Sequence, residues 1–269
     1  MDIKDIHIND LTYTYPAGVT ALRDVSLRIR AGESVTIIGQ NGSGKTTLAK
    51  HLNGLLKPTS GSVRVGDIDT RQSTVAQLAA LVGYVFQNPD EQLFASTVRS
   101  EVMFGPKNLG LPEESVISRS MAALDLVGLK ERADVHPYDL SLGNRKRVAI
   151  ASVLAMDTPV IVLDEPTIGQ DHTGVELIGQ IVDNLISQGK TVITITHDMD
   201  FCAEHFERVV VMMEGKILLN GSTREVLAQA DVLMRAYVEP PQISKLATKL
   251  GIKGVPLSVD EFVDLIIRS

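Results

Sequence analysis

Apolar and polar positions in the first part of the chain follow the patterns of strands and then of a helix. Positions 6–15 alternate in part and positions 25–29 alternate strictly, which is typical of a half-buried strand. Positions 34–38 form a mostly β-branched run that leads into a glycine-rich turn. Helical spacing follows at positions 45–55, so the pattern predicts strands first and then a strand, a turn and a helix.

Two near-continuous β-rich runs appear later, at positions 160–163 and 191–196. Such runs suit strands that are buried on both faces of a parallel sheet. Between them, apolar residues recur at helical spacing over positions 172–188, and Gly189 stands where a glycine commonly ends a helix. The alternation of strand, helix and strand predicts an α/β fold.

The segment from about 87 to 155 has a different pattern, with prolines and helix-like stretches at 113–127 and 145–156. We expect it to form a mostly helical subdomain that is inserted into the sheet domain. The end of the chain contains two capping-box patterns, at 222–225 and 258–261, which predict helix starts. A small helical extension is therefore expected at the C-terminus.

Composition narrows the classes of protein that fit. The chain has 269 residues, of which 44% are apolar and 22% charged, as in ordinary soluble globular proteins. The single cysteine, Cys202, excludes a disulfide framework and fits a reducing compartment. A net charge of −7 argues against bulk nucleic acid as the main partner. No apolar run approaches the roughly 18 residues that span a bilayer, and no secretory signal is visible, so a membrane role is expected to run through a partner.

The glycine-rich turn after positions 34–38 carries the clearest chemistry, because it matches the G-x-x-x-x-G-K-[ST] pattern of a phosphate-binding loop. Its glycines allow backbone N–H groups to surround a β-phosphate, next to the positive end of a helix. Lys45 brings a charge to the β- and γ-phosphates, and the Thr46 hydroxyl is a ligand for Mg²⁺. The alternative is a glycine-rich turn without a ligand. The loop consists of Gly39, Gln40, Asn41, Gly42, Ser43, Gly44, Lys45 and Thr46.

Two acids follow the apolar run at 160–163. Asp164 ends a predicted parallel strand at the ligand-binding edge of the sheet, where it is placed to hold Mg²⁺ directly or through water. Glu165 points elsewhere and is expected to polarise a water aimed at the γ-phosphate. An acid pair at a strand end is common by itself, but beside a phosphate-binding loop it becomes a specific signal.

Together these motifs resemble the nucleotide-binding subunit of ATP-binding-cassette (ABC) transporters. The resemblance covers roughly residues 6–221 and implies a P-loop NTPase of the ABC type with a mixed sheet core. It implies a cassette domain at 1–221, a helical subdomain at about 87–156 within it, and a helical dimerisation extension at 222–269. The motifs come in the family's order: the phosphate loop, Gln87, the signature segment 140–144, the segment 163–167, Asp171 and His197.

The resemblance implies a role for each matched residue. The resemblance implies catalytic roles for Glu165, for His197, which contacts the γ-phosphate, and for Gln87, which senses Mg²⁺ and the attacking water. The Mg²⁺ ligands are Thr46, Gln87 and Asp164, and the nucleotide is ATP. Tyr15 stacks on adenine, although Tyr13 is a rival. Further nucleotide contacts are implied for Thr47 and Asp171.

The signature segment of one subunit covers the γ-phosphate held by a second subunit in this family, which implies that role for Ser141 and Gly143. The sequence departs from the usual pattern at Leu142, Asn144 and Gln170, while Ser141 and Gly143 match it. Residues 145–147 are three consecutive basic residues, which we interpret as the solvated first turn of a helix.

A narrower resemblance, carried by segments 85–94, 104–110 and 147–156, is to the energy-coupling-factor ATPases. It implies a motor subunit, peripheral on the cytoplasmic face of the cell membrane, that drives uptake of a vitamin or a transition-metal ion. The implied partners are a second ATPase subunit in a homo- or heterodimer, an integral membrane coupling protein and a small substrate-binding membrane protein, with no nucleic acid.

Other functions remain open at this point. One alternative is a soluble cassette ATPase that acts on DNA or the ribosome, but no sustained heptad run and only one phosphate loop are present. A small-molecule P-loop kinase would not explain the signature segment. We expect residues 87–105 to expose acidic and apolar side chains as the docking surface for the membrane partner, against the alternative that they pack the helical subdomain. The acids in that stretch are Asp90, Glu91 and Glu101, and the apolar residues are Leu93, Phe94, Val98 and Phe104.

Overall fold

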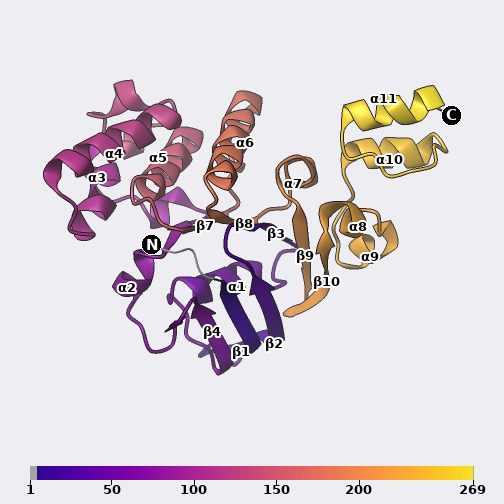
Figure 1. Ribbon diagram of the computed structural model, residues 1–269, viewed down its shortest axis with the longest axis horizontal. Helices are drawn as coiled ribbons and strands as arrows, with labels where there is room; N and C mark the ends of the chain where they lie inside the picture. The colour runs from indigo at the N-terminus through magenta and orange to yellow at the C-terminus, as the bar shows by residue number, and fades with distance from the viewer. Residues whose placement is uncertain (1–4, 269) are drawn as a thin grey trace.

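A six-stranded sheet forms the centre of the protein in this computed structural model, which describes residues 5–268 (Figure 1). The strand order is β10-β9-β3-β8-β7-β6; β10 pairs antiparallel with β9, and the other neighbours pair in parallel. The expected mixed sheet is therefore confirmed. The strands are β3 (Ser34–Ile38), β6 (Val82–Val85), β7 (Val160–Asp164), β8 (Thr191–Ile195), β9 (Arg208–Met213) and β10 (Lys216–Ser222).

The central strands are buried at every position, as their continuous apolar runs predict. This holds for β3, β7 and β8, whose β-branched side chains face helices on one side and the second sheet on the other. The second sheet is antiparallel, with the order β2-β1-β4-β5. In β2 the residues Val25, Leu27 and Ile29 are buried and alternate with exposed residues, which confirms the predicted half-buried strand. Its strands are β1 (Ile6–Thr14), β2 (Thr20–Ile29), β4 (Ser60–Val65) and β5 (Ile68–Asp69).

Helix α1 (Lys45–Leu52) lies between the two sheets and follows directly from β3. Helix α2 (Val75–Ala79) precedes β6. Helix α6 (His172–Ser187) connects β7 to β8 and ends before Gly189, whose φ of 75° is the left-handed conformation that glycine adopts without strain. Helix α7 (Met199–His205) connects β8 to β9.

Three longer helices are inserted between the neighbouring strands β6 and β7 and project from one end of the molecule (Figure 1). They are α3 (Val98–Asn108), α4 (Glu113–Leu126) and α5 (Leu142–Leu154), with the short 3₁₀ turns η1 (Pro89–Glu91), η2 (Lys130–Arg132) and η3 (Pro137–Asp139). Helix α5 begins three residues before the predicted start at 145, because the Ser141 hydroxyl caps it and accepts from the Asn144 N–H at 3.3 Å.

The expected exposure of residues 87–105 is wrong for several of them. The Glu101 carboxylate is buried, and it accepts hydrogen bonds from the N–H groups of Phe94 and Ala95 at 2.9 and 2.7 Å. Leu93 and Val98 are also buried, in the core of the helical subdomain. Glu101 thus satisfies two backbone N–H groups inside the subdomain, and Leu93 and Val98 fill its core. Phe94 and Phe104 remain exposed and form an edge-to-face pair with ring centroids 4.7 Å apart.

Four helices follow β10 at the other end of the molecule (Figure 1): α8 (Thr223–Leu227), α9 (Ala230–Arg235), α10 (Gln242–Lys249) and α11 (Val259–Arg268). Leu227 of α8 and Leu233 of α9 share a core with Val209 and Val211 of β9. Helices α8 and α9 therefore complete the sheet domain, although the expected division of the chain falls at residue 222. Within residues 5–268, none of the helices has the length and apolarity that a membrane span needs.

The first predicted capping box is present in full, because Ser222 and Glu225 exchange hydrogen bonds. The second is only half formed. Ser258 Oγ accepts from the Glu261 N–H at 3.2 Å, but the Glu261 carboxylate accepts from the Leu257 N–H at 2.9 Å and pairs with Arg224 instead of returning to Ser258. Glu261 thus ties α11 to α8.

Candidate nucleotide-binding site

The phosphate-loop residues form the turn between β3 and α1, as their pattern predicts. Close packing requires glycine at two positions of this turn. A Cβ on Gly39 would lie 2.2 Å from the Met212 carbonyl oxygen, and one on Gly44 would lie 2.8 Å from the Ala21 carbonyl oxygen. Both residues also have a positive φ, of 145° and 103°. The loop is therefore held tightly against β2 and β9.

Lys45 lies across this loop. Its Nζ donates to the carbonyl oxygens of Gly39 at 2.7 Å and Gln40 at 3.0 Å. Burial lowers the pKa of Lys45, and the carboxylates of Glu165 and Asp164 oppose that shift. A phosphate oxygen near Nζ would carry a full negative charge, which attracts the ammonium more strongly than the carbonyl dipoles do. Lys45 is therefore placed to bind an anion.

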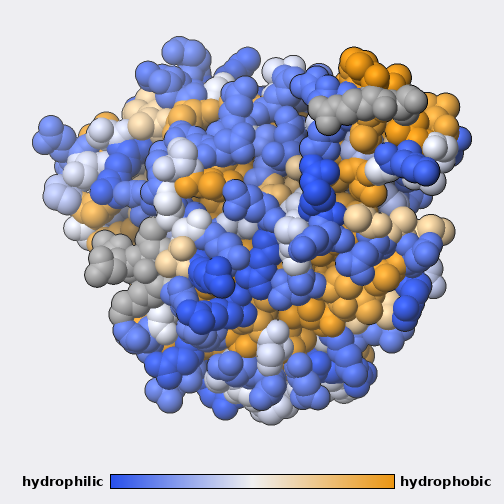
Figure 2. Space-filling view, turned by 45° about the vertical axis from the view of Figure 1, so that its right-hand side comes forward, coloured by the Kyte–Doolittle hydropathy of each residue, from blue (hydrophilic) through white to orange (hydrophobic). Residues whose placement is uncertain are grey.

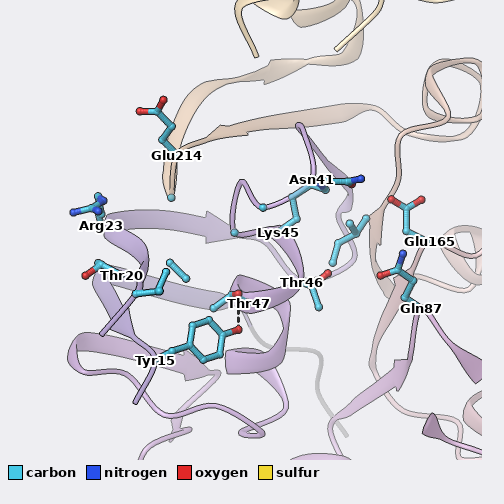
Figure 3. A pocket seen from close by; sticks show the side chains of 16 residues that line it. Tyr15, Thr20, Arg23, Asn41, Lys45, Thr46, Thr47, Gln87, Glu165 and Glu214 are labelled. Atoms are coloured by element: carbon cyan, nitrogen blue, oxygen red, sulfur yellow. Dashed lines mark hydrogen bonds between the residues drawn. The ribbon is translucent and has the colours of Figure 1, made fainter. Parts of the chain in front are cut away.

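A cavity of about 820 Å³ opens over the loop (Figure 3). Lys45 and Thr46 lie in the middle of the view, Tyr15 on one side, and Gln87 and Glu165 on the other. The predicted residues that line the cavity are Tyr15, Asn41, Gly42, Gly44, Lys45, Thr46, Thr47, Gln87 and Glu165.

Tyr15 is the better candidate for stacking on a base. It lines the cavity, is partly exposed, and its hydroxyl lies 3.0 Å from Thr47 Oγ1. Its rival Tyr13 is buried and packs edge-to-face against both Tyr15 and His51. Tyr13 therefore supports the Tyr15 ring from behind.

Part of the cavity wall comes from residues that no sequence motif marks. These residues come from the start of β2, from the end of β8, and from the turn between β9 and β10, which hydrogen bonds hold against β2 and the phosphate loop. The Arg23 N–H donates to the Gly215 carbonyl at 2.9 Å, and the Gly215 N–H donates to the Ser43 carbonyl at 3.0 Å. These residues carry no local motif, so only strand pairing could reveal them: Val19, Thr20, Ala21, Arg23, Ile195, Glu214 and Gly215.

Asp164 lies at the carboxyl end of β7, behind the cavity. Its Oδ2 accepts from the Tyr84 hydroxyl at 2.9 Å, while its buried Oδ1 has no hydrogen-bond partner among the described residues. Burial raises the pKa of Asp164, and the hydroxyls of Tyr84 and Thr46 oppose that shift. A buried carboxylate oxygen without a partner fits a divalent cation, which would supply the missing charge.

The surroundings of Asp164 suit Mg²⁺ in particular. The described residues contain no cluster of three or more His, Cys, Asp and Glu side chains. Mg²⁺ is commonly held by one or two carboxylates together with substrate phosphates, so a dedicated cage is not needed. Thr46 and Gln87 both line the same cavity and offer further oxygen ligands.

Glu165 has an unusual backbone, with a φ of 48°. This left-handed conformation is strained for a residue with a Cβ, and it directs the side chain into the cavity. The Glu165 N–H donates to the Ile195 carbonyl at 2.8 Å, and Oε2 lies 2.9 Å from Nδ1 of the exposed His197. The structure thus brings together Glu165 and His197, which stand more than thirty positions apart in the chain.

The signature segment and Asp171 do not line this cavity. Ser141 is exposed as the cap of α5, and Asp171 is exposed as the cap of α6, where its carboxylate accepts from the Gly174 N–H at 2.8 Å. Gly143 packs against Gly169, whose carbonyl oxygen would lie 2.7 Å from a Cβ at Gly143. These residues therefore do not contribute to the cavity of their own chain.

Gln170, which stands where leucine is typical of the family pattern, connects the turn after β7 to the start of α5. Its Nε2 donates to the Gly143 carbonyl at 2.9 Å, and its Oε1 accepts from Arg147 Nε at 3.0 Å. A leucine could make neither bond. Gln170 therefore braces the signature segment against the turn that follows β7.

The prediction of a solvated basic turn at 145–147 is wrong. Lys146 is only 1% exposed, and its ammonium donates to three backbone carbonyls. Arg145 pairs with Asp90 at 3.1 Å, and Arg147 bonds to Gln170. Burial lowers the pKa of Lys146 to about 8. Local sequence favours a solvated turn, but α5 packs over the end of β6 and buries the middle residue.

Comparison with known proteins agrees with these features. The model of the ABC transporter family matches residues 22–168. A putative ABC transporter ATP-binding protein of Caldanaerobacter subterraneus is 45% identical over 258 residues; the match covers 96% of this chain and 45% of that protein, so this chain spans less than half of its length. An energy-coupling factor transporter ATP-binding protein, EcfA, of Methanosphaera stadtmanae is 41% identical over 271 residues, covering 97% of this chain and 98% of that protein.

Solved structures show the same likeness. One is cbiO1 from Clostridium perfringens, described as part of the ABC transporter complex cbiONQ. It superposes with a TM-score of 0.77 at 36% identity, covering 93% of this chain and all of that one. Another is the dimeric ATP-binding cassette MJ0796 bound to ADP and phosphate, with a TM-score of 0.74 at 31% identity, covering 81% of this chain and 99% of that one.

Proposed function

The chain belongs to the ABC transporter family of ATPases, and from this premise we propose that it is the ATP-hydrolysing motor subunit of a membrane import complex. The proposed cargo is a vitamin or a transition-metal ion that passes through separate membrane subunits. The observation that carries the proposal is the cavity over the phosphate loop, which gathers Lys45, Thr46, Gln87 and Glu165 beside Asp164. Likeness to EcfA and to cbiO1 supports the import role.

Each side of the cavity has a proposed task in ATP hydrolysis. Tyr15 stacks on adenine, while Lys45 and the loop N–H groups bind the β- and γ-phosphates. Thr46, Asp164 and Gln87 would hold Mg²⁺, which neutralises charge on the phosphates when it is bound.

Glu165 orients the attacking water and accepts its proton. His197 lies against Glu165 through Nδ1, so its proposed task is to orient that carboxylate beside the γ-phosphate.

A second ATPase subunit completes the site in this proposal. Ser141 and Asp171 do not line the cavity of their own chain and are exposed, so another subunit can cover them, while Gly143 is buried beside Gly169. Ser141 and Gly143 stand at the start of α5, where a hydroxyl and helix N–H groups are donors for phosphate oxygens. The partner is a second copy of this chain or a related ATPase.

The C-terminal helices are proposed to hold the two subunits together when no nucleotide is bound. Phe262 packs inward, but several apolar side chains on α10 and α11 are exposed. Figure 2 shows apolar surface gathered around the C-terminal end of the chain. An exposed face of this kind marks a protein interface. Its residues are Leu246 of α10, Leu250 directly after α10, and Val259, Val263 and Ile267 of α11.

The docking surface for the membrane partner is proposed to be smaller than residues 87–105 as a whole. It is centred on the exposed pair Phe94 and Phe104, with the exposed acid Glu91 nearby in the chain. An apolar helix face with basic flanks fits such a surface. Docking there places the chain at the cytoplasmic face of the membrane as a peripheral subunit.

Changing Phe94 and Phe104 to serine together tests this surface. The double variant is expected to keep the basal ATPase rate of the isolated subunit and to lose assembly with the membrane proteins. The matched control is Ile117→Ser on α4, a similarly exposed apolar residue of the same subdomain, which should assemble normally. Normal assembly of the double variant would overturn the docking assignment.

Purification from detergent-solubilised membranes tests the function itself. A tagged chain is expected to bring integral membrane proteins with it in fixed stoichiometry, and the assembled complex should hydrolyse ATP. Co-purification with ribosomes or DNA instead of membrane proteins would favour the soluble cassette ATPase and contradict the import role.

A further inference from the structure

Lys146 is the largest side chain in the fully buried interior, and its contacts join two segments of the nucleotide site. Its Nζ donates to the carbonyl oxygens of Phe86 at 2.9 Å and Gln87 at 2.5 Å, which follow β6. It also donates to the carbonyl oxygen of Asp164 at the end of β7, at 3.3 Å. One side chain of α5 therefore holds both strand ends.

The three carbonyls account for all of the hydrogen-bonding capacity of this ammonium. A lysine ammonium has three donors and no acceptor, so each donor has one partner here. The carboxylates of Asp164 and Glu165 oppose the lowering of the Lys146 pKa by burial. The oriented carbonyl dipoles replace water around a charge that would otherwise be costly to bury. Lys146 therefore connects α5 to the ends of β6 and β7 through specific hydrogen bonds.

The tethered peptide units carry the residues that face the cavity. The Gln87 carbonyl belongs to the peptide unit directly after the Gln87 side chain, and the Asp164 carbonyl belongs to the unit that leads into Glu165. Glu165 keeps its strained φ of 48° between two hydrogen bonds, its own N–H to Ile195 and the preceding carbonyl to Lys146. Removal of Lys146 frees one of these two constraints.

We propose that Lys146 is a positioning residue for hydrolysis, whose ammonium fixes Gln87 and Glu165 relative to one another and to α5, the helix that begins at the signature segment. The residue does not line the cavity, so it acts through backbone and not on the nucleotide. This inference rests on the proposed ATPase function and deepens it. It also gives α5 a direct connection from the signature segment to the site of hydrolysis in the same chain.

Two variants of Lys146 and one control test the proposal. Lys146→Met keeps most of the length of the side chain but has no N–H donor, and Lys146→Gln keeps two N–H donors. Lys57→Met is the control, because the Lys57 ammonium also donates to backbone carbonyls, those of Thr70 and Ser73, but away from the cavity. The measurements are kcat, the Kd for ATP, the thermal midpoint, and amide hydrogen exchange at residues 86–88 and 164–165.

We expect kcat of Lys146→Met to fall about a hundredfold, as for a misplacement of about 1 Å in catalytic groups, with the Kd for ATP within about threefold of wild type. Lys146→Gln should recover part of kcat. Amide hydrogen exchange should rise at residues 86–88 and 164–165 in Lys146→Met but not in Lys57→Met, which should lose thermal stability without losing kcat.

A kcat of Lys146→Met close to that of wild type would overturn the proposal. A loss of both kcat and ATP affinity that accompanies a lower thermal midpoint would also overturn it, because a purely structural role predicts that all three fall together. If Lys146→Met does not fold, Lys146→Gln decides: a reduced kcat at unchanged Kd supports positioning, and an unchanged kcat overturns it. A wild-type chain without ATPase activity would instead refute the proposed function.

Discussion

Gly143→Ala is the sharpest single change that the structure offers in the signature segment. A Cβ at this position would lie 2.7 Å from the carbonyl oxygen of Gly169 and 3.5 Å from the side-chain amide of Gln170. The first contact is with backbone, which cannot rotate away, so the turn after β7 must move. Gly221→Ala is a matched control, since its Cβ would meet only side-chain atoms at 3.4 Å or more.

Two opposing effects set the size of the change. Alanine in place of a helical glycine gains at most about 1 kcal/mol from intrinsic propensity. Overpacking of a close contact costs about 1–3 kcal/mol, and a backbone neighbour favours the upper part of that range. We therefore expect Gly143→Ala to lose about 1–2 kcal/mol of unfolding free energy, or about 4 °C in the thermal midpoint. Gly221→Ala should stay within about 0.5 kcal/mol of wild type.

Urea unfolding and steady-state ATPase assays measure the two consequences. The variant should also lose ATPase activity at saturating ATP while its ATP affinity stays unchanged, because Gly143 does not line the cavity of its own chain. A variant as stable and as active as wild type would refute the reasoning from the 2.7 Å contact.

Three further changes have expected outcomes. Lys45→Ala should abolish tight ATP binding, since it removes the ammonium at the β- and γ-phosphates; unchanged affinity by titration calorimetry would contradict this. Gln170→Leu should lose about 1–3 kcal/mol of stability in urea unfolding, because the bonds to Gly143 and Arg147 are both lost, and equal stability would show that they contribute nothing. Removal of residues 240–269 should leave a soluble cassette that sediments as a monomer without nucleotide and dimerises with ATP; a nucleotide-free dimer of that length would exclude the extension as the dimerisation element.

The parts of the fold that could be predicted are those with local physical causes. The continuous runs of β3, β7 and β8 are buried on both faces, and no surface position in a folded chain suits such runs. The phosphate loop was predictable because its pattern lies within eight consecutive residues, in which glycine supplies the positive φ at Gly39, Gly42 and Gly44. The placement of Asp164 and Glu165 followed from their position at the end of a parallel strand.

The parts that were missed depend on contacts between distant segments. Three consecutive basic residues indicate a solvated turn, and only the packing of α5 over β6 and β7 makes Lys146 an internal tether. Glu101 looked exposed because nothing nearby in sequence shows that two backbone N–H groups need its carboxylate. Glu214 and Gly215 reach the cavity through the pairing of a turn with β2, which no local pattern encodes.

Phosphate release by wild type and Glu165→Gln tests the central claim most directly. With Mg²⁺ and ATP, the wild-type chain should turn over, and Glu165→Gln should bind ATP with wild-type affinity but hydrolyse it at least about a hundredfold more slowly, as expected for loss of a general base. The variant should also accumulate as an ATP-bound dimer in sedimentation. Near-wild-type turnover by Glu165→Gln would contradict the account of this cavity as the site of hydrolysis.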